Sequence, residues 1–397
     1  MDNFHATVLN LHQPLGNLEE LLDTKDWEAK EILYALDRIP DALTGNEDLA
    51  RIHLALSGTL LETLSNPDFQ SRVYGIVKCG DLLWKLRNPA IEILGTGYYH
   101  PVLPLIPPAD REEHLARWFG IASHLFDRYQ FSGFWPPEMG FSMELIPLLN
   151  RLGFRYVLVD SERVEAATPM SWDELRYRPH LATYDGEDIV VIVRDRELSN
   201  SQESGMDADW FIHEVGQRTK HCDFPALVTT CSDGDNGGWF RNTDWSSNFW
   251  GAFYLPMLER VRDKSAGLSP IFIHDYLDRY GTYGEVIVHA GAWNTGEHDG
   301  SGFVQWTGSQ VQKDALQTVS EVSDSIHKQR WKQGQLGWPD AEAGRLLEEA
   351  MWHLLLSETS CNFYWGEHWV PRCYRELDEA LGCLQAARER SDNQDAK

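Results

Sequence analysis

The chain has 397 residues and a formal net charge of −26. This length suits a barrel with an appended domain, and a hydrophobic fraction of 42% is enough for a large core. The negative charge argues against nucleic acids and anionic membranes as partners, because both bind basic surfaces. It also favours a neutral substrate over a polyanion. No run of 18 apolar residues occurs, so we expect no transmembrane helix.

The N-terminus and the cysteines predict a cytoplasmic protein. The opening MDNFHATVLNLHQP has no basic region followed by an apolar stretch, so it indicates a first strand and not a signal peptide. The six cysteines are scattered without CxxC spacing, which indicates neither a zinc site nor a disulfide framework. Reduced thiols in the cytoplasm are the expectation. We predict no metal and no other cofactor, and the oligomeric state stays open.

In chain order, apolar patterns predict strands that alternate with helices up to about residue 308. Strands are predicted at 4–11, 90–95, 154–159, 189–193, 226–230 and 285–289. Helices are predicted at 17–45, 48–65, 68–87, 110–129, 143–152 and 249–262, and residues 199–205 are predicted to form a mobile loop. Three helices follow, at 309–333, 340–360 and 372–390, and the last residues, 391–397, are predicted to be a disordered tail.

This order predicts two parts in an α/β protein. Strands that are each followed by a helix describe a βα barrel better than a flat sheet. The barrel, with long loop insertions, is assigned to residues 1–308, and a C-terminal helical region to residues 309–390.

Polar side chains recur where the predicted strands end. They are His12 with Gln13, Glu92 with His100, Glu138, and Asp233 with Asp235. In parallel α/β folds the chemistry gathers at the carboxyl ends of the strands. The chain has no Gly-x-Ser-x-Gly motif, no P-loop and no dinucleotide fingerprint. These clusters therefore leave two possibilities, paired-carboxylate chemistry or a hard-metal site.

Glu138 follows Phe134-Trp-Pro-Pro137, a short apolar run that two prolines end. Taken alone, it is as well explained as a carboxylate favoured by a helix N-terminus. The sixteen tryptophans add a second signal, because several stand beside glycine, asparagine and acids. Flat apolar faces next to hydrogen-bonding groups suit sugar rings, although aromatic core under long loops is the competing interpretation. Candidate stacking platforms are Trp293, Trp306 and Trp365.

Paired carboxylates with exposed tryptophans point to glycoside hydrolysis. One carboxylate must be ionised to attack the anomeric carbon, and the other must be protonated to release the leaving oxygen. The residues alone leave open whether Glu138 or Asp233 is the acid.

Four strings in the right order resemble the motifs of glycoside hydrolase family 57 across roughly residues 5–310. They are LNLHQP at 9–14, AIEILGTGYYHPVLPLIP at 90–107, GFWPPEMGFS at 133–142 and CSDGDNGGWF at 231–240. The resemblance implies a distorted (β/α)7-type barrel with a helical segment after it. It assigns the nucleophile to Glu138 and the acid/base to Asp233, and it implies a retaining mechanism on α-glucans or α-galactosides. Asp235 stands where many members have glutamate, and LSETSCNFYWGEHW at 356–369 resembles the fifth motif loosely.

The predicted function is therefore a retaining α-glycoside hydrolase or α-glucanotransferase that acts on an oligo- or polysaccharide. His12, Glu92, His100 and Asp235 are predicted to bind sugar hydroxyls. Three alternatives stay open: an α-galactosidase, a non-catalytic α-glucan-binding homologue on the same barrel, and a metal-dependent deacetylase. The last is disfavoured because the clusters contain no HxH, HxxxH or HxxE ligand pair.

Overall fold

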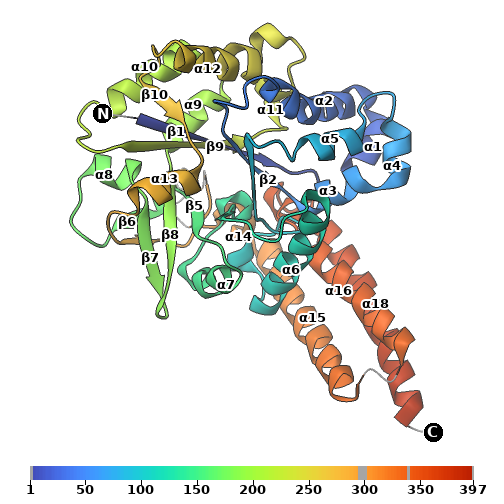
Figure 1. Ribbon diagram of the computed structural model, residues 1–397. Helices are drawn as coiled ribbons and strands as arrows, with labels where there is room; N and C mark the ends of the chain where they lie inside the picture. Colours follow the sequence, from blue (N-terminus) through green and yellow to red (C-terminus); the bar gives the residue numbers. More distant parts are fainter. Residues whose placement is uncertain (1–2, 294–301, 338–339, 396–397) are drawn as a thin grey trace.

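A computed structural model describes residues 3–293, 302–337 and 340–395. Its centre is a mostly parallel sheet in the order β3-β2-β1-β9-β8-β5-β4, which curls into a barrel (Figure 1). The predicted barrel class is confirmed. The strands of this path are β1 (Asn3–Leu11), β2 (Ile52–Leu56), β3 (Ile91–Leu94), β4 (Gly133–Phe134), β5 (Tyr156–Asp160), β8 (Glu187–Arg194) and β9 (Ala226–Asp233).

Two short joins close the barrel. At the ends of the path, Gly95 N–H donates to Gly133 O at 2.9 Å, and Trp135 N–H donates to Gly95 O at 2.8 Å. Gly95 must be small here, because a Cβ on it would lie 2.3 Å from the ring of Phe154. β8 and β9 pair through Arg194 and Thr229.

Further strands extend this framework. β10 (Leu268–Pro270) pairs with β1, and β7 (His180–Tyr184) pairs antiparallel with β8. β6 (Val164–Ala166) and β11 (Val286–Val288) form a separate two-stranded sheet, so the predicted strand at 285–289 exists but lies outside the barrel.

Alternation along the strands divides the core into an inside and an outside. Val8, Ala55, Leu94, Leu158 and Ile192 fill the barrel interior, while the residues between them pack against the surrounding helices. These helices are α1 (Asn17–Thr24), α2 (Asp26–Leu43), α3 (Gly58–Ser65), α4 (Pro67–Val73), α5 (Cys79–Lys85), α6 (Pro108–Phe126), α7 (Ile146–Arg151), α8 (Trp172–Tyr177), α9 (Arg196–Glu203), α10 (Ala208–Arg218), α11 (Gly237–Arg241), α12 (Leu255–Arg262), α13 (Ile273–Tyr280) and α14 (Val304–Thr307).

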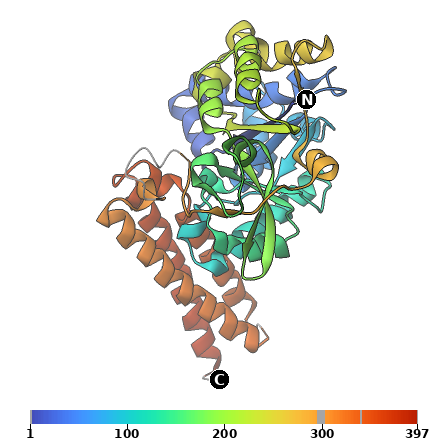
Figure 2. The same ribbon diagram turned by 90° about the vertical axis from the view of Figure 1, so that its left-hand side faces the viewer.

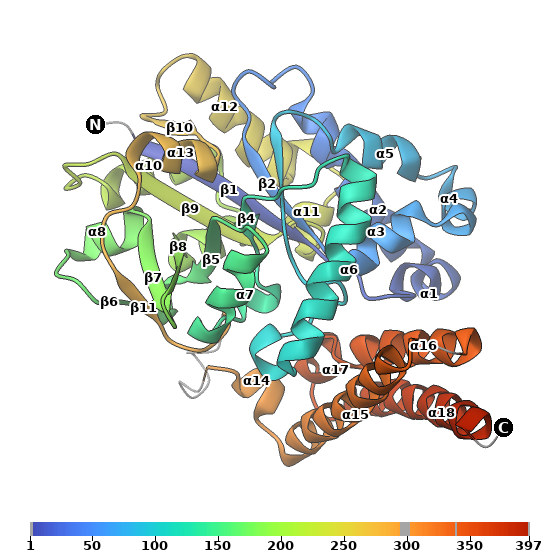
Figure 3. The same ribbon diagram turned by 60° about the horizontal axis from the view of Figure 1, so that its bottom comes forward.

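The C-terminal helices project from one side of the barrel (Figures 1 and 2). They are α15 (Gln310–Gln335), α16 (Ala341–Ser357), α17 (Cys361–Tyr364) and α18 (Val370–Asp395). A capping box between Ser309 and Gln312 starts α15 by satisfying backbone N–H groups that the helix cannot. Figure 3 shows α17 close to α6, so this region meets the barrel at the side that carries α6.

Three local predictions are wrong. The helix predicted at 48–65 contains β2, because IHLAL is buried on both faces and shows no alternation. The mobile loop predicted at 199–205 overlaps α9, whose Ser199 is fully buried. The last helix runs through Asp395, past the predicted start of a disordered tail at residue 391. Within the described ranges, every helix is too short or too polar to cross a membrane.

Candidate active site

Glu138 lies in a strained turn directly after β4. The turn, Pro137–Met139, places Glu138 at φ 57° and Met139 at φ 50°, in the left-handed region. His100 also has φ 58°. Each such non-glycine residue costs about 1–2 kcal/mol. Strain of this kind gathers where the surrounding structure fixes a functional geometry.

Two neutral donors hold the Glu138 carboxyl. Ser360 Oγ donates to Oε1 at 2.7 Å, and Trp293 Nε1 donates to Oε2 at 3.0 Å. His100 Nε2 lies 3.7 Å from Oε1. Burial and, less strongly, the nearby Asp233 raise the pKa of Glu138 to about 7 against the opposing hydrogen bonds from Ser360 and Trp293. The side chain keeps 14% of its surface exposed, so a substrate can reach it.

His12 and His100 form a stacked pair beside this carboxyl, with ring centroids 4.0 Å apart and an interplanar angle of 7°. Burial lowers the pKa of His12 to about 3, and burial with the neighbouring His12 lowers that of His100 well below 6.5. Both rings are therefore neutral at physiological pH. They can exchange hydrogen bonds with hydroxyl groups without adding positive charge to the site.

The hydrogen bonds around His12 define its tautomer. Thr59 Oγ1 donates to Gln13 O, so Ser57 Oγ must donate to Thr59. Ser57 Oγ then accepts from Nδ1 of His12 at 2.9 Å. Nε2 is left as an acceptor, with the thiol of Cys361 3.8 Å away. His12 therefore presents an acceptor nitrogen toward the fifth-motif segment.

Asp233 ends β9 and Asp235 follows it, and residues of the LNLHQP string hold both. Asn10 Nδ2 donates to Asp233 Oδ1 at 2.9 Å, and Gln13 Nε2 donates to Asp235 Oδ2 at 3.0 Å. Burial raises the pKa of Asp233, and burial together with Asp233 raises that of Asp235 to about 7. Glu138, Asp233 and Asp235 thus form a cluster of buried carboxyls that favours retention of a proton.

Two residues of the site were missed from the sequence. Ser360 comes from the loosely matching fifth motif, and nothing in its own neighbourhood pointed to Glu138. Arg194 is fully buried at the end of β8, donates to Asp160 Oδ2 at 2.8 Å, and has its guanidinium carbon 5.5 Å from the Trp293 ring centroid. Its positive charge lowers the pKa of Asp233 against the effect of burial. Its position at the end of a predicted strand was the available signal.

Glu92 belongs to a different cluster, inside the barrel at the second residue of β3. Tyr156 OH donates to its Oε1 at 3.1 Å, and His274 Nδ1 lies 2.8 Å from its Oε2. His53 Nε2 is 3.4 Å away but accepts from Ile273 N–H, while its Nδ1 donates to Thr7 O. His274 is therefore the histidine with the shorter contact to Glu92. Both oxygens of Glu92 have protein partners inside the barrel, and its predicted binding of sugar hydroxyls stays a prediction.

The three candidate platforms differ. Trp293 bonds Glu138 and packs edge-on against Trp135 at 5.6 Å. Trp306 is fully buried and packs on Tyr364, so it offers no face to a sugar, contrary to the prediction. Trp365, after α17, is 53% exposed and keeps a free face. Most of the glycine-rich loop at 291–302 lies outside the described residues.

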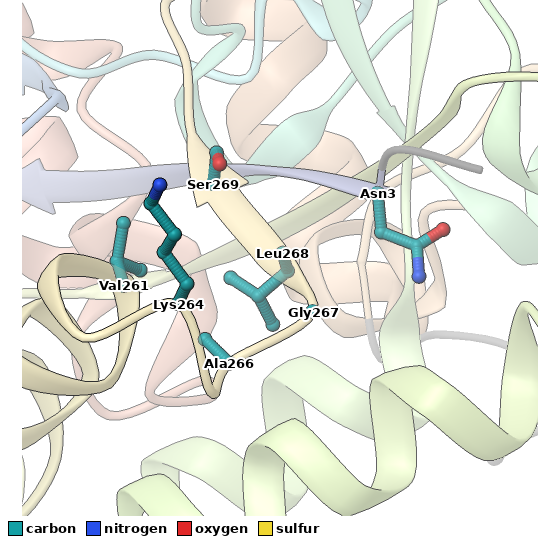
Figure 4. A pocket seen from close by; sticks show the side chains of 7 residues that line it. All are labelled: Asn3, Val261, Lys264, Ala266, Gly267, Leu268 and Ser269. Carbon is teal, nitrogen blue, oxygen red and sulfur yellow. The ribbon is translucent and has the colours of Figure 1, made fainter.

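Of two cavities in the protein, one lies beside the site and one lies far from it. A cavity of about 120 Å³ lies next to it, between the HQP loop and the C-terminal helices, and includes Thr59, Cys361 and Asn362. A cavity of about 230 Å³ lies where β1 begins, around Asn3 and Leu268 (Figure 4). Asn3 pairs with Ala226, seven residues before Asp233 on β9, so this second cavity is roughly 23 Å from the carboxyl cluster. It takes no part in the site.

The sequence profile of glycosyl hydrolase family 57 matches residues 17–334. An alpha-amylase from Pyrococcus horikoshii is 29% identical over 199 residues, which cover 49% of this chain and 28% of the relative. A 4-alpha-glucanotransferase from Thermococcus kodakarensis is 29% identical over 201 residues, which cover 50% of this chain and 27% of the relative. The match therefore spans little more than a quarter of each relative's length.

Solved structures agree in fold. A GH57-type branching enzyme from Pyrococcus horikoshii has a TM-score of 0.71 at 15% identity, over 98% of this chain and 88% of that chain. A 4-alpha-glucanotransferase from Thermococcus litoralis has a TM-score of 0.60 at 20% identity, over 96% of this chain and 60% of that chain. At these identities the likeness establishes the barrel and its helical extension.

Proposed function

Because the chain belongs to glycosyl hydrolase family 57, we propose that it is a retaining α-glycoside hydrolase or α-glucanotransferase acting on α-glucans such as maltooligosaccharides. The observation that carries the proposal is the carboxyl cluster. Glu138 accepts from two neutral donors, and Asp233 is near enough to raise its pKa. The matched relatives named alpha-amylase and 4-alpha-glucanotransferase support the choice of α-glucans.

In the first step, ionised Glu138 attacks the anomeric carbon, and the bond from that carbon to the leaving oxygen breaks. Protonated Asp233 gives its proton to the leaving oxygen, so the leaving sugar departs as a neutral alcohol. The donors on Glu138, Ser360 Oγ and Trp293 Nε1, stabilise the charge that the carboxylate carries before attack.

In the second step, Asp233 takes a proton from water or from an acceptor sugar hydroxyl. The activated oxygen attacks the anomeric carbon and releases Glu138. Hydrolysis and transfer differ in which oxygen arrives. His12, His100 and Asp235 lie around the two carboxyls and are proposed to bind sugar hydroxyls, and Trp365 is proposed to stack on a sugar ring.

Incubation with maltooligosaccharides, pullulan and α-galactosides, followed by chromatography of the products, tests this function. We expect maltooligosaccharides to be converted. Longer products would show transfer, and shorter products alone would show hydrolysis. Release of galactose without conversion of any glucan would replace the α-glucan proposal by an α-galactosidase.

Calorimetry with the same maltooligosaccharides separates an enzyme from a binding protein. Heat of binding without any new product over a long incubation would identify a non-catalytic α-glucan-binding homologue. The catalytic proposal requires product formation that the Glu138→Gln variant lacks.

A further inference from the structure

We propose that Glu358 is a positioning residue for Glu138. Anchored against α6, it fixes the turn that brings Ser360 to the nucleophile. The inference rests on the proposed function, since it concerns the residue assigned there as the nucleophile. It makes the C-terminal helices part of the catalytic machinery, although they lie beside the barrel in Figure 3.

The anchor is a cluster of polar side chains buried where α6 meets the C-terminal helices. His114 of α6 and Glu358 are both inaccessible to solvent, and His114 Nε2 lies 2.9 Å from Glu358 Oε2. Asp110, also of α6, is fully buried and lies 2.6 Å from Nε2 of His327 on α15. Two helices, α6 and α15, and the C-terminal end of α16 therefore meet through one network.

The protons of this network can be assigned in one consistent way. Tyr99 N–H donates to His114 Nδ1 at 3.4 Å, so Nε2 of His114 carries the ring proton and donates to Glu358. His327 Nε2 donates to Asp110 Oδ1. Asp110 Oδ2 and Glu358 Oε1 are buried and have no other partner within the described part of the chain. One proton between these two oxygens satisfies both.

The electrostatics place that proton on Glu358. Burial and the adjacent Asp110 carboxyl raise the pKa of Glu358 well above its usual value. Burial would raise that of Asp110 too, but hydrogen bonds from His327 and Glu358 hold it below its usual value. Asp110 also sits in the first turn of α6, where the helix dipole favours a negative charge. Glu358 therefore acts as a neutral acid that donates to an ionised aspartate.

Each residue of the turn that follows Glu358 contacts the barrel. Glu358 ends α16. Thr359 forms a bridge with Pro101, and Ser360 N–H donates to His100 O at 3.1 Å. Ser360 Oγ then donates to Glu138 at 2.7 Å. One residue, Thr359, separates the anchor from the donor, so a shift of Glu358 moves the Ser360 hydroxyl.

The polar side chains of this cluster are better suited to orienting the chain at Glu358 than to stabilising the fold. Apolar residues of similar volume often replace buried polar networks without loss of stability, while a hydrogen-bonded network specifies one arrangement. His114 and Asp110 act as two directional contacts on one carboxyl group. They fix both the position and the rotation of the chain at residue 358.

The test compares four variants in the full-length protein. Glu358→Ala removes the anchor, Ser360→Ala removes the donor, and Glu358→Gln keeps the neutral hydrogen-bonding pattern. Gln333→Ala is the control, because it breaks a buried hydrogen bond to Ser391 in the same helical region without touching the turn. We expect Glu358→Ala to lower kcat at least about tenfold, the effect of losing one hydrogen bond to a charged group, with KM nearly unchanged. Glu358→Gln should restore kcat, and Gln333→Ala should leave it unchanged.

A second readout needs no turnover. The pKa of Glu138 is measured by carbon-13 NMR of the labelled carboxyl, assigned by comparison with Glu138→Gln. Loss of the Ser360 hydrogen bond raises this pKa, so Glu358→Ala and Ser360→Ala should both raise it. The titratable groups that face Glu138, including Asp233, His100 and Cys361, are unchanged in these variants.

A normal Glu138 titration and normal kcat in Glu358→Ala would overturn the inference, as would a Glu358→Gln variant as impaired as Glu358→Ala. If Glu358→Ala does not fold, His114→Phe keeps the ring and removes the Nε2 donor, and the same shifts are expected on a smaller scale. If the wild-type protein converts no glycan, the proposed function fails, whereas the NMR titration still decides the role of Glu358.

Discussion

Two buried glutamates in the same barrel have opposite electrostatics. Burial raises the pKa of Glu138 to about 7. Burial would also raise that of Glu92, but the hydrogen bonds and charge interactions with His274 and His53 together outweigh it, and the pKa falls to about 2. The difference lies in the groups that surround each carboxyl. Glu92 faces a histidine that can be cationic, while Glu138 has neutral donors and another carboxyl opposite.

The comparison separates a structural carboxylate from a chemical one. Glu92 has both oxygens occupied by fixed partners, and its charge is satisfied. Glu138 carries a charge that the folded protein stabilises incompletely and that, in the proposed mechanism, reacts when a sugar arrives. Perturbed carboxyls of this second kind gather at active sites. The predictions below test the contrast, from the largest expected effect on activity to the smallest.

Glu138→Gln should lower kcat on maltooligosaccharides by on the order of 10⁴-fold or more, because the amide cannot form the covalent intermediate. Its free energy of unfolding should not decrease, since the change removes a buried charge opposite Asp233. Initial rates and urea unfolding measure the two quantities. An active Glu138→Gln enzyme would remove the basis for the distinction between the two glutamates.

Trp293→Phe should lower kcat by about 10- to 100-fold. The substitution keeps an aromatic ring against Trp135 but removes the Nε1 donor to Glu138, and a hydrogen bond to a charged group contributes about 1.5–3 kcal/mol. Steady-state kinetics on one maltooligosaccharide measures the loss. Trp306→Phe, at a ring buried away from the carboxyl, is the matched control and should retain its rate.

The value of kcat/KM should fall as the pH is lowered through about 7. Glu138 must be ionised to attack, and in the free enzyme it takes up a proton near that pH. Removing the Trp293 donor should move this fall in kcat/KM to higher pH, because that hydrogen bond lowers the pKa of Glu138. A profile that stays flat from pH 5 to 7 would contradict the assignment of Glu138 as the group that must ionise.

Glu92→Gln should leave activity within about threefold and lower the free energy of unfolding by about 3 kcal/mol, as expected when a buried ion pair loses one partner. Glu92, with its lowered pKa, stabilises the fold above pH 4.5 and loses this effect as the pH falls toward 2. His274, with its raised pKa, stabilises below pH 6.5 and loses this effect as the pH rises past its folded value. The difference between wild type and variant should therefore be greatest between pH 4.5 and 6.5, as urea unfolding at several pH values would show.

The sequence predicted the parts of the site that adjoin strand ends. His12, Glu138 and Asp235 lie just after buried strands, and Asp233 is the last residue of β9. Parallel pairing brings those ends together. It could not separate Glu92 from this group, since one position along a strand decides between the barrel interior and its rim. The role of Ser360 could not be predicted from the sequence, because its contact with Glu138 depends on how α16 docks against α6.

Secondary structure was also predictable where local sequence determined it and not where tertiary packing did. Strands with turn residues after them were found, whereas β2 was assigned to a helix because leucine and alanine also favour helices. Trp306 could not be told from an exposed ring by its glycine-rich surroundings, and only its packing on Tyr364 shows that it is core. Local sequence therefore predicted the carboxyl cluster, and tertiary packing determined what holds it.

The most direct test of the central claim is to trap the covalent intermediate. The protein is incubated with a fluorinated α-glucosyl fluoride, whose ring fluorine slows breakdown of the covalent glycosyl-enzyme. Its peptides are then mapped by mass spectrometry. The account predicts a glucosyl adduct on Glu138, absent in Glu138→Gln. An adduct on Asp233, or turnover of the reagent with no adduct on any carboxylate, would contradict it.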